Sequence, residues 1–353
     1  MNIHTIILAA GKGTRMNTNL PKVMQPLGGQ TLISHVIQTA KENSENITIV
    51  VGYKKNILKT HIANIDPNIK TADQDDQLGT AHAVKMASHL IKDDEKILIL
   101  YGDVPLISSK TIEGLINSGH ECTLLTMQLN DPTGYGRVIT NGQNLALKIV
   151  EQKDASEDEL KIEEVFTGVL LIDGSLLRTA LEEIKNQNSA NEYYLTDLVE
   201  ILSRKGVKIK CIQANPAEVL GANNKHELHK LELILRKMSA EKLLEQGVTL
   251  IDKTRVDVRG KVVAGKDCSI DVNVILEGDV TFGNNVIIKS NVVLQDVFIG
   301  DNSIIESFSH LSSASVGSNC NIGPYARIRD CLLYTSDAAD DMQCVDLGGR
   351  RII

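Results

Sequence analysis

The stretch ILAAGKGTRM, residues 7–16, places two glycines, a lysine and an arginine directly after a short apolar run. A glycine-rich turn after a strand commonly holds phosphate, because its backbone can approach a ligand closely. The Rossmann fingerprint requires a third glycine where this chain has Met16, and no window supplies the Walker motif G-x-x-x-x-G-K-[ST]. The turn therefore indicates either an anion site of another kind or a tight strand-to-helix connection.

Short β-rich runs alternate with helical stretches through about residue 225. Because the runs are apolar on both faces, they predict an α/β domain with a mostly parallel, Rossmann-like sheet that is covered on two sides. Ligands of such a domain bind at the carboxyl ends of the strands. Strands are predicted at residues 5–10, 46–52, 96–103, 121–127 and 168–172.

Beyond this region the periodicity changes. Residues 224–247 carry apolar side chains at helical spacing and end at Gly247, which predicts a linker helix. From Val256 to Ile328 every sixth residue is apolar except His310. A strict hexad is typical of a β-helix, so we expect the repeated residue to stack inside and the register to hold without slipping. Unrelated strands with chance spacing are the alternative.

The hexad fails after Ile328, because Asp340 and Asp346 fall on later repeat positions and buried carboxylates would destabilise a solenoid core. The chain end is therefore predicted to be foreign to the fold, poorly ordered and unable to cap the last coil. The predicted organisation is an α/β domain at 1–223, the linker helix at 224–247, a partial β-helix at 248–329 and a tail at 330–353.

Composition narrows the class of protein. A formal net charge of -8 argues against a general nucleic-acid binder, which needs a basic surface. Six cysteines without a C-x-x-C pair disfavour a zinc site and a disulfide framework, so we expect reduced thiols. No segment approaches the roughly 20 apolar residues that span a bilayer, and the first glycines replace any signal-peptide cleavage site. These features predict a cytoplasmic protein without membrane insertion.

Several segments in order resemble the sugar-nucleotide pyrophosphorylases, and most closely the bacterial bifunctional N-acetylglucosamine-1-phosphate uridylyltransferase/glucosamine-1-phosphate acetyltransferase family. The resemblance covers residues 3 to about 329 and implies that the β-helix is a left-handed hexapeptide-repeat solenoid, here truncated. The segments are ILAAGKGTRM with PKVM, QLGTAHA (77–83), YGDVPLI (101–107), DPTGYGRV (131–138), IVEQKDA (149–155) and EYYLTD (192–197).

For the nucleotide, the resemblance implies that Arg15 and Lys22 hold the phosphates of UTP and that Gln74 and the pair Gly79-Thr80 contact uracil. Cations at the phosphates would offset the charge that develops during transfer. Arg15, Lys22 and Asp103 are the implied catalytic residues. The implied nucleotide-binding residues are Leu8, Ala9, Ala10, Gly11, Lys22, Gln74, Gly79, Thr80, Tyr101, Gly102 and Asp103.

The resemblance also implies a Mg²⁺ cofactor held by Asp103, at the end of a predicted strand, and by Asn223 in VLGANNK (219–225). One carboxylate and one amide oxygen suit a hard cation that keeps waters and gains phosphate oxygens. From the residues alone, Asp103 is explained equally well as a cap of the turn after the strand.

On the sugar side the resemblance points to Gly136, Glu151, Tyr194 and Thr196, together with the position of Phe166. The family usually has asparagine where this chain has Phe166. Losing an amide that hydrogen-bonds a sugar hydroxyl can cost about 1–3 kcal/mol, so this residue predicts a weakened or altered choice of sugar.

The implied reaction transfers UMP from UTP to N-acetylglucosamine-1-phosphate, which supplies UDP-N-acetylglucosamine for peptidoglycan and lipopolysaccharide precursors. The sugar phosphate is already an anionic nucleophile, so no general base is needed and the histidines are expected to be structural. Arg329 matches the first basic residue of the family's acetyltransferase site but its partners have no counterparts, so we expect no acetyl transfer. The family forms homotrimers through its β-helix, which the shortened helix puts in doubt.

Two other functions remain open at this stage. One is a nucleotidyltransferase with a different sugar or nucleotide; EYYLTD and QLGTAHA argue for uridine and an N-acetyl sugar, whereas Phe166 favours another sugar. The other is a catalytically silent scaffold subunit, which the presence of Arg15, Lys22, Asp103 and Asn223 together disfavours.

Overall fold

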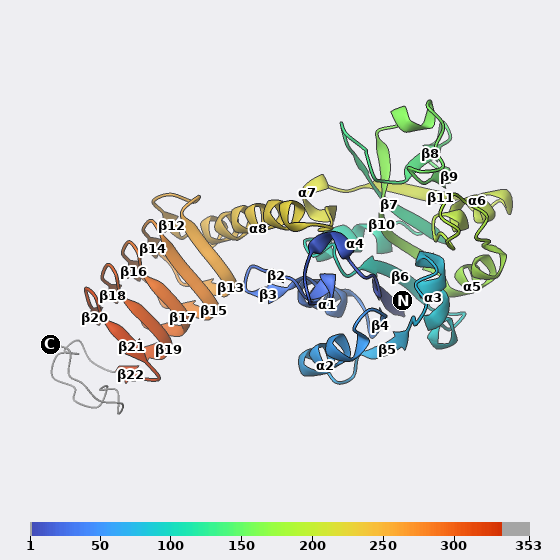
Figure 1. The fold of residues 1–353 in the computed structure, drawn as a ribbon. Helices are drawn as coiled ribbons and strands as arrows, with labels where there is room; N and C mark the ends of the chain where they lie inside the picture. Colours follow the sequence, from blue (N-terminus) through green and yellow to red (C-terminus); the bar gives the residue numbers. More distant parts are fainter. Residues whose placement is uncertain (1, 334–353) are drawn as a thin grey trace. The chain divides into compact units, whose positions relative to one another are not determined.

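The structure is a computed structural model that describes residues 2–333, and these form two compact units (Figure 1). The first unit contains residues 2–25 and 31–228, and the second contains residues 26–30 and 229–333. Helix α8 (Lys225–Glu245) begins in the first unit and continues in the second, over nearly the residues predicted for the linker helix. The sequence did not indicate that the short segment 26–30 groups with the second unit.

A mostly parallel sheet forms the middle layer of the first unit. Its strand order is β11-β7-β10-β6-β1-β4-β5, in which β10 alone of these strands runs antiparallel to its neighbours β6 and β7. The predicted α/β architecture is thereby confirmed. The strands are β1 (Ile3–Ala9), β4 (Asn46–Val51), β5 (Lys70–Asp73), β6 (Lys96–Tyr101), β7 (Cys122–Gln128), β10 (Glu164–Asp173) and β11 (Ile209–Gln213). In addition, β8 (Arg137–Thr140) pairs with β10, and β9 (Ala146–Val150) pairs with β8.

Helices cover both faces of this sheet because successive side chains of a strand point to opposite sides. In β1, Ile6 and Leu8 belong to one apolar cluster, whereas Ile7 and Ala9 belong to the other. The first cluster includes side chains from α3, α5 and α6, and the second includes side chains from α1, α2 and α4. These helices are α1 (Leu32–Asn43), α2 (Lys55–Ile65), α3 (Thr80–Ala87), α4 (Ser109–Ile116), α5 (Gly174–Glu183) and α6 (Asp197–Arg204).

Each coil of the second unit lies on the next through parallel pairing, as in a β-helix. Its apolar core contains Val274, Leu276, Val292 and Leu294, which are fully buried. The short strands are β12 (Thr249–Leu250), β14 (Ser269–Ile270), β16 (Ile287–Ile288), β18 (Ile304–Ile305) and β20 (Asn321–Ile322). The longer sheet contains β13 (Val256–Ala264), β15 (Val274–Phe282), β17 (Val293–Ile299), β19 (His310–Val316) and β21 (Arg327–Arg329), with β22 (Leu332–Leu333) paired to β19.

The expectation of one uninterrupted hexad register is wrong beyond Val292. Phe298 is 48% exposed, whereas Val297 and Ile299 on either side of it are buried. The cause is a change in coil length: β13 pairs with β15 at a separation of 18 residues, but β17 pairs with β19 at a separation of 17. Relative to an 18-residue coil, one residue is missing from β17 opposite the segment between Glu277 and Thr281, where the pairing of β15 with β17 shifts by one.

The ladder of the second unit extends to Leu333, which is buried and pairs with Val316. It therefore passes the predicted start of the tail at residue 330, and the remainder of that predicted tail lies outside the described residues, as does Cys344. Four cysteines are free and buried as expected, but Cys331 is disulfide-bonded, contrary to the expectation of reduced thiols. The four free ones are Cys122, Cys211, Cys268 and Cys320.

The segment 26–30 joins the second unit through contacts with α8 and β13. It includes β2 (Pro26–Leu27) and the first residue of β3 (Gln30–Thr31). The backbone N–H of Gly28 donates to Glu232 Oε2 at 3.0 Å, and a Cβ on Gly29 would lie 2.6 Å from the carbonyl oxygen of Arg259. Both glycines have a positive φ, and a Cβ on Gly28 would meet the Leu235 side chain, which explains why this turn carries two glycines.

The shortened coil predicts different effects for two neighbouring apolar residues. Leu294→Ala should reduce the free energy of unfolding of the second unit by about 2–5 kcal/mol, because Leu294 is fully buried in the core. Phe298→Ala should change it by less than about 0.5 kcal/mol, because that side chain is largely exposed. Amide hydrogen exchange of β17 and β19 measures both values. Equal losses would instead support the uninterrupted register.

Candidate active site

A cavity of about 530 Å³ opens in the first unit at the carboxyl ends of β1 and β6. Parallel strands end at the same edge of a sheet, so residues from distant parts of the chain meet there. The cavity is lined by most of the residues singled out from the sequence: Leu8, Ala9, Ala10, Gly11, Lys22, Gln74, Gly79, Thr80, Tyr101, Asp103, Gly136, Glu151, Phe166, Tyr194, Thr196 and Asn223.

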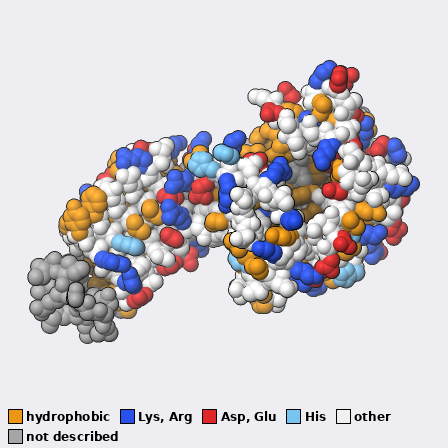
Figure 2. All heavy atoms as spheres, in the orientation of Figure 1, with side chains coloured by type: hydrophobic (Ala, Val, Ile, Leu, Met, Phe, Trp, Pro, Cys, Tyr) orange, Lys and Arg blue, Asp and Glu red, His pale blue; other side chains and the backbone are white. Residues whose placement is uncertain are grey.

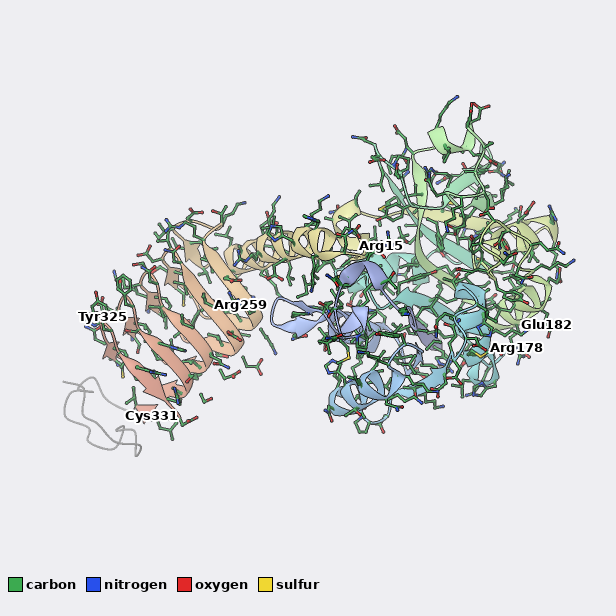
Figure 3. The ribbon with its side chains drawn as sticks, in the orientation of Figure 1. Arg15, Arg178, Glu182, Arg259, Tyr325 and Cys331 are labelled. Carbon is green, nitrogen blue, oxygen red and sulfur yellow. The ribbon has the colours of Figure 1, made fainter. Side chains whose placement is uncertain are left out.

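Arg15 and Gly102 are the two predicted site residues that lie outside this lining. Arg15 is exposed on the 3-10 turn η1 (Thr14–Met16), as Figure 3 shows. Gly102 faces the core instead, because a Cβ there would meet Ile33 at 2.9 Å and Val23 at 3.1 Å.

The lining also contains residues that sequence analysis did not single out. Gln77, Gly134, Tyr135 and Glu192 lie inside segments that carried the family resemblance, so the signal was present but was not resolved to single residues. Thr167 and Gly168 follow Phe166 in β10, where the pairing with β7 is irregular between Phe166 and Leu170.

The glycine turn controls the path of Lys22. Gly13 adopts a left-handed conformation with φ of 59°, and a Cβ on it would lie only 2.6 Å from the Lys22 Cβ. A Cβ on Gly11, in contrast, would meet nothing within 4 Å. The second glycine is therefore required by packing, whereas the first leaves open space in the cavity wall.

Lys22 lies between two oxygen-bearing side chains at one end of the cavity. Its ammonium group forms an ion pair with Asp103 Oδ2 and donates a hydrogen bond to Asn223 Oδ1 at 3.0 Å. The Lys22 and Asp103 side chains are each only 15% exposed. The backbone holds the same arrangement, because the Ala222 N–H donates to the Asp103 carbonyl at 3.1 Å.

The residues present fit a divalent cation at this end. Asp103 and Asn223 place a carboxylate and an amide oxygen on a single positive group, which is the donor set that hard cations prefer. Within residues 2–333 no three side chains of His, Cys, Asp or Glu gather into a metal-binding group. A cation bound here would therefore take its other ligands from water or from a phosphate ligand.

A second region of the cavity presents an ordered amide. Gln74 is buried, and its Nε2 contacts the Gly79 carbonyl and His82 Nδ1, both at 3.0 Å, which leaves its amide oxygen to accept. Gly79 has a φ of 117°, and a Cβ there would lie 2.4 Å from the Tyr193 carbonyl oxygen. Thr80 Oγ1 accepts from the Leu195 N–H at 2.9 Å, so this turn is fixed to the segment that precedes α6.

Another part of the cavity lining is acidic. Thr196 Oγ1 donates to Glu151 Oε1 at 3.0 Å, but burial outweighs this bond and raises the pKa of Glu151, with Asp154 and Glu192 adding to the effect. Burial raises the pKa of Asp197 to about 6, with the charge of Glu151 as the next cause. Glu151 and Thr196 therefore offer hydrogen-bond acceptors to a ligand, whereas Lys22 offers a positively charged donor.

Phe166 forms an apolar wall in the same cavity. It is 6% exposed and belongs to the apolar cluster that includes Val138 and Ile149. Its backbone N–H donates to the Gly136 carbonyl at 2.9 Å, which fixes the residue against the turn before β8. The side chain supplies no hydrogen bond to a ligand.

The remaining surface gives little sign of a large polyanion as a ligand. On the face drawn in Figure 2, lysine and arginine side chains are interspersed with aspartate and glutamate. No helix in the described part of the chain combines the length and apolar character that a bilayer crossing requires.

Comparison with known families gives two matches. Residues 5–190 match the family described as MobA-like NTP transferase domain. Residues 258–346 match the family described as GMPPB C-terminal domain, a match that also runs past residue 330.

Individual relatives are similar over nearly the whole chain. Proteins named bifunctional protein GlmU are 43% identical over 333 residues in Idiomarina loihiensis and 41% identical over 331 residues in Marinobacter nauticus. Each alignment covers 93% of this chain, and 73% and 72% of those relatives respectively. A putative glucose-1-phosphate thymidylyltransferase from Bacillus anthracis, solved in complex with a sucrose, is similar in fold. Its TM-score is 0.51 at 19% identity, over 65% of this chain and 94% of that one.

The two glycines of the first turn predict a matched pair of variants. Gly13→Ala should destabilise the first unit by roughly 1–3 kcal/mol, because it combines a left-handed residue with a Cβ that meets Lys22. Gly11→Ala should leave stability within about 0.5 kcal/mol, since its Cβ would occupy open space. Urea denaturation monitored by circular dichroism tests both. A Gly13→Ala protein as stable as the Gly11→Ala protein would contradict this account of the turn.

Asp197 predicts a pH dependence of stability. Its folded-state pKa of about 6 lies above the ordinary value of 3.8, so the folded protein binds this proton more tightly and loses stability as pH rises between those values. Asp197→Asn should therefore stabilise the protein at pH 7 by about 1 kcal/mol, since solvent screens a half-buried group, and the gain should vanish near pH 3.5. Thermal unfolding at several pH values measures the difference. A gain that does not depend on pH would exclude this cause.

Proposed function

The chain belongs to the family of bifunctional GlmU proteins, and from that premise we propose that it transfers UMP from UTP to N-acetylglucosamine-1-phosphate with Mg²⁺ as cofactor. The products are UDP-N-acetylglucosamine and pyrophosphate. The chain is an enzyme, a nucleotidyltransferase of the UDP-N-acetylglucosamine pyrophosphorylase type. We propose three things beyond this class of enzyme: that the nucleotide is UTP, that the sugar is N-acetylated and that the cation is Mg²⁺.

One observation carries it: the Lys22 ammonium group is held between Asp103 and Asn223 at the carboxyl ends of β1 and β6. Lys22 and a cation bound by the two oxygen atoms would place two positive charges beside a polyphosphate. Phosphoryl and nucleotidyl transfer depend mainly on such positioning and charge neutralisation. This favours catalysis over a silent scaffold.

The chain's own residues support an in-line displacement. A phosphate oxygen of the sugar phosphate forms a bond to the α-phosphorus of UTP, and the bond from that phosphorus to the bridging oxygen of the β-phosphate breaks to release pyrophosphate. Lys22 neutralises charge on the phosphates during this step. Asp103 and Asn223 would hold Mg²⁺, which supplies further neutralisation of the phosphate charge when bound.

The two other regions of the cavity match the remaining parts of the substrates. The free amide oxygen of Gln74 can accept from the N3–H of uracil, beside Gly79 in the same cavity lining. In the acidic part of the cavity lining, Glu151 and Thr196 offer oxygen atoms to sugar hydroxyls. This arrangement orients the sugar phosphate with its phosphate toward Lys22.

A second candidate is a nucleotidyltransferase with a different sugar. Phe166 favours it, because its ring places an apolar surface in the cavity and offers no hydrogen bond to an acetamido group. The proposal concerns nucleotidyl transfer only. Location in the cytoplasm, left-handed winding of the β-helix and assembly into homotrimers follow from the family resemblance and stay predictions.

The test is a measurement of pyrophosphate release with Mg²⁺, N-acetylglucosamine-1-phosphate and each nucleoside triphosphate in turn. We expect release with UTP and little with the others. A parallel series with glucose-1-phosphate and glucosamine-1-phosphate tests the second candidate, which faster release with either would favour. Failure to release pyrophosphate with every pair would favour the scaffold.

Asp103→Asn should lower kcat by about 10²–10³-fold, because the amide keeps the size of the side chain but removes the negative charge that holds the cation. The control Asp94→Asn removes an exposed carboxylate of the same unit and should leave kcat unchanged. Pyrophosphate release and thermal unfolding are measured for both variants. Retained activity in a folded Asp103→Asn protein would mean that the cation binds elsewhere.

A further inference from the structure

Asn223 can face Lys22 with its amide oxygen only because the other end of the amide is already occupied. Its Nδ2 donates to Glu227 Oε2 at 3.1 Å, and its backbone N–H donates to the same carboxylate oxygen at 2.8 Å. A carboxylate only accepts hydrogen bonds and an ammonium group only donates them. The amide between these two groups therefore has a single orientation that satisfies both, with Oδ1 toward Lys22 and Asp103.

Glu227 is fixed in turn by the start of α8. Asn224 Nδ2 donates to Glu227 Oε1 at 2.6 Å, and the Glu227 backbone N–H donates to Asn224 Oδ1 at 3.0 Å. Both oxygens of the carboxylate are thus engaged, one by each asparagine. The contacts form a reciprocal cap of the kind that commonly opens a helix, but one of them also reaches the candidate cation site.

The charge of Glu227 also acts within the cavity. Burial raises the pKa of Tyr135, which lines the cavity, and the negative charges of Glu227 and Asp103 raise it further. The two carboxylates therefore contribute to the field at the same point. A negative charge behind an amide ligand increases the electron density on the amide oxygen and favours a cation bound to it.

We propose that Glu227 is a positioning residue for the cation site: through its hydrogen bonds to Asn223 it holds the amide oxygen toward the cation. The proposal rests on the proposed function, because it assigns a role within the same site. Glu227 lies outside the cavity lining. The competing explanation is that Glu227 only caps α8, in which case its loss would affect stability and leave cation binding unchanged.

Three variants separate these explanations. Glu227→Ala removes both the cap and the bonds to Asn223. Glu227→Gln keeps an oxygen that can accept both N–H groups of Asn223, and so preserves the orientation of the amide while removing the charge. Asn224→Ala removes both hydrogen bonds between Asn224 and Glu227 but leaves the two bonds between Asn223 and Glu227 in place.

The measurement is the binding of Mn²⁺ to the full-length protein in the presence of UTP and without sugar phosphate, with free Mn²⁺ followed by electron paramagnetic resonance. We expect Glu227→Ala to weaken Mn²⁺ binding about tenfold, as substitutions behind metal ligands commonly do. Glu227→Gln should recover most of that loss. Asn224→Ala should lower the melting temperature about as much as Glu227→Ala, yet weaken Mn²⁺ binding far less.

Steady-state kinetics provide the second readout. The Mg²⁺ concentration for half-maximal activity should rise in Glu227→Ala about as much as the Kd for Mn²⁺, whereas the KM for the sugar phosphate should not change. If Glu227→Ala does not fold, Glu227→Asp serves the same purpose, because its shorter side chain withdraws the carboxylate from Asn223.

Two results would overturn the role of Glu227 alone: Mn²⁺ affinity that is unchanged in Glu227→Ala, or an equal loss in Asn224→Ala. If the unsubstituted protein with UTP fails to bind Mn²⁺, the cation site itself is wrong, and the proposed function loses its cofactor as well. The comparison of unsubstituted protein with variants therefore distinguishes the two failures.

Discussion

A positive charge that is largely shielded from water must be matched by oxygen atoms, and in this protein that requirement brings three distant segments together. The ammonium group of Lys22 is paired with Asp103 and bonded to Asn223, so the turn after β1, the end of β6 and the start of α8 meet at one point. Removing a single partner would leave a charge or a polar group without compensation, which is strongly unfavourable in a partly buried site. The conformation of the first glycine turn, the end of the sheet and the beginning of the long helix are thus mutually constrained.

The same constraint gives the cavity its polarity. Lys22 and Glu151 both line the cavity, and Asp197 follows the lining residue Thr196 in the chain. Burial raises the pKa of Glu151 and of Asp197, because it disfavours their charged forms. A ligand with an anionic group at one end and hydroxyl groups at the other is complementary to this distribution. An arrangement of this kind selects the direction in which a substrate enters as well as its chemical class.

The architecture could be predicted from the sequence because hydrophobic patterning follows burial directly. The strands at 5–10 and 96–103 and the helix at 224–247 were predicted to within a few residues, since each carries an unambiguous period. The hexad pattern predicted the β-helix but not its exact register. Two repeat positions in each coil face inward, and both are occupied mainly by apolar residues. After the coils shorten, Val316 and Ile322 are therefore still buried, although Phe298 and His310, which come earlier in the same hexad series, are exposed. Two losses of one residue each therefore left no mark in a count of apolar residues. The role of segment 26–30 depends on a contact between residues about 200 positions apart in the chain. The role of Glu227 depends on hydrogen bonds, which have no periodicity in the sequence. Neither could be recognised from a local pattern.

The mixture of 18-residue and 17-residue coils has a consequence for the evolution and engineering of this solenoid. Its stacking does not demand identical repeats, because the pairing of β15 with β17 shifts by one residue and every later pair of strands keeps the shorter separation of 17 residues. Shifts of this kind keep the parallel pairing on both sides, so the stack tolerates coils that are one residue shorter. The positions of these shifts are consequently the places where short peptides could be inserted, or coils exchanged between related chains, while the stacked interior is kept.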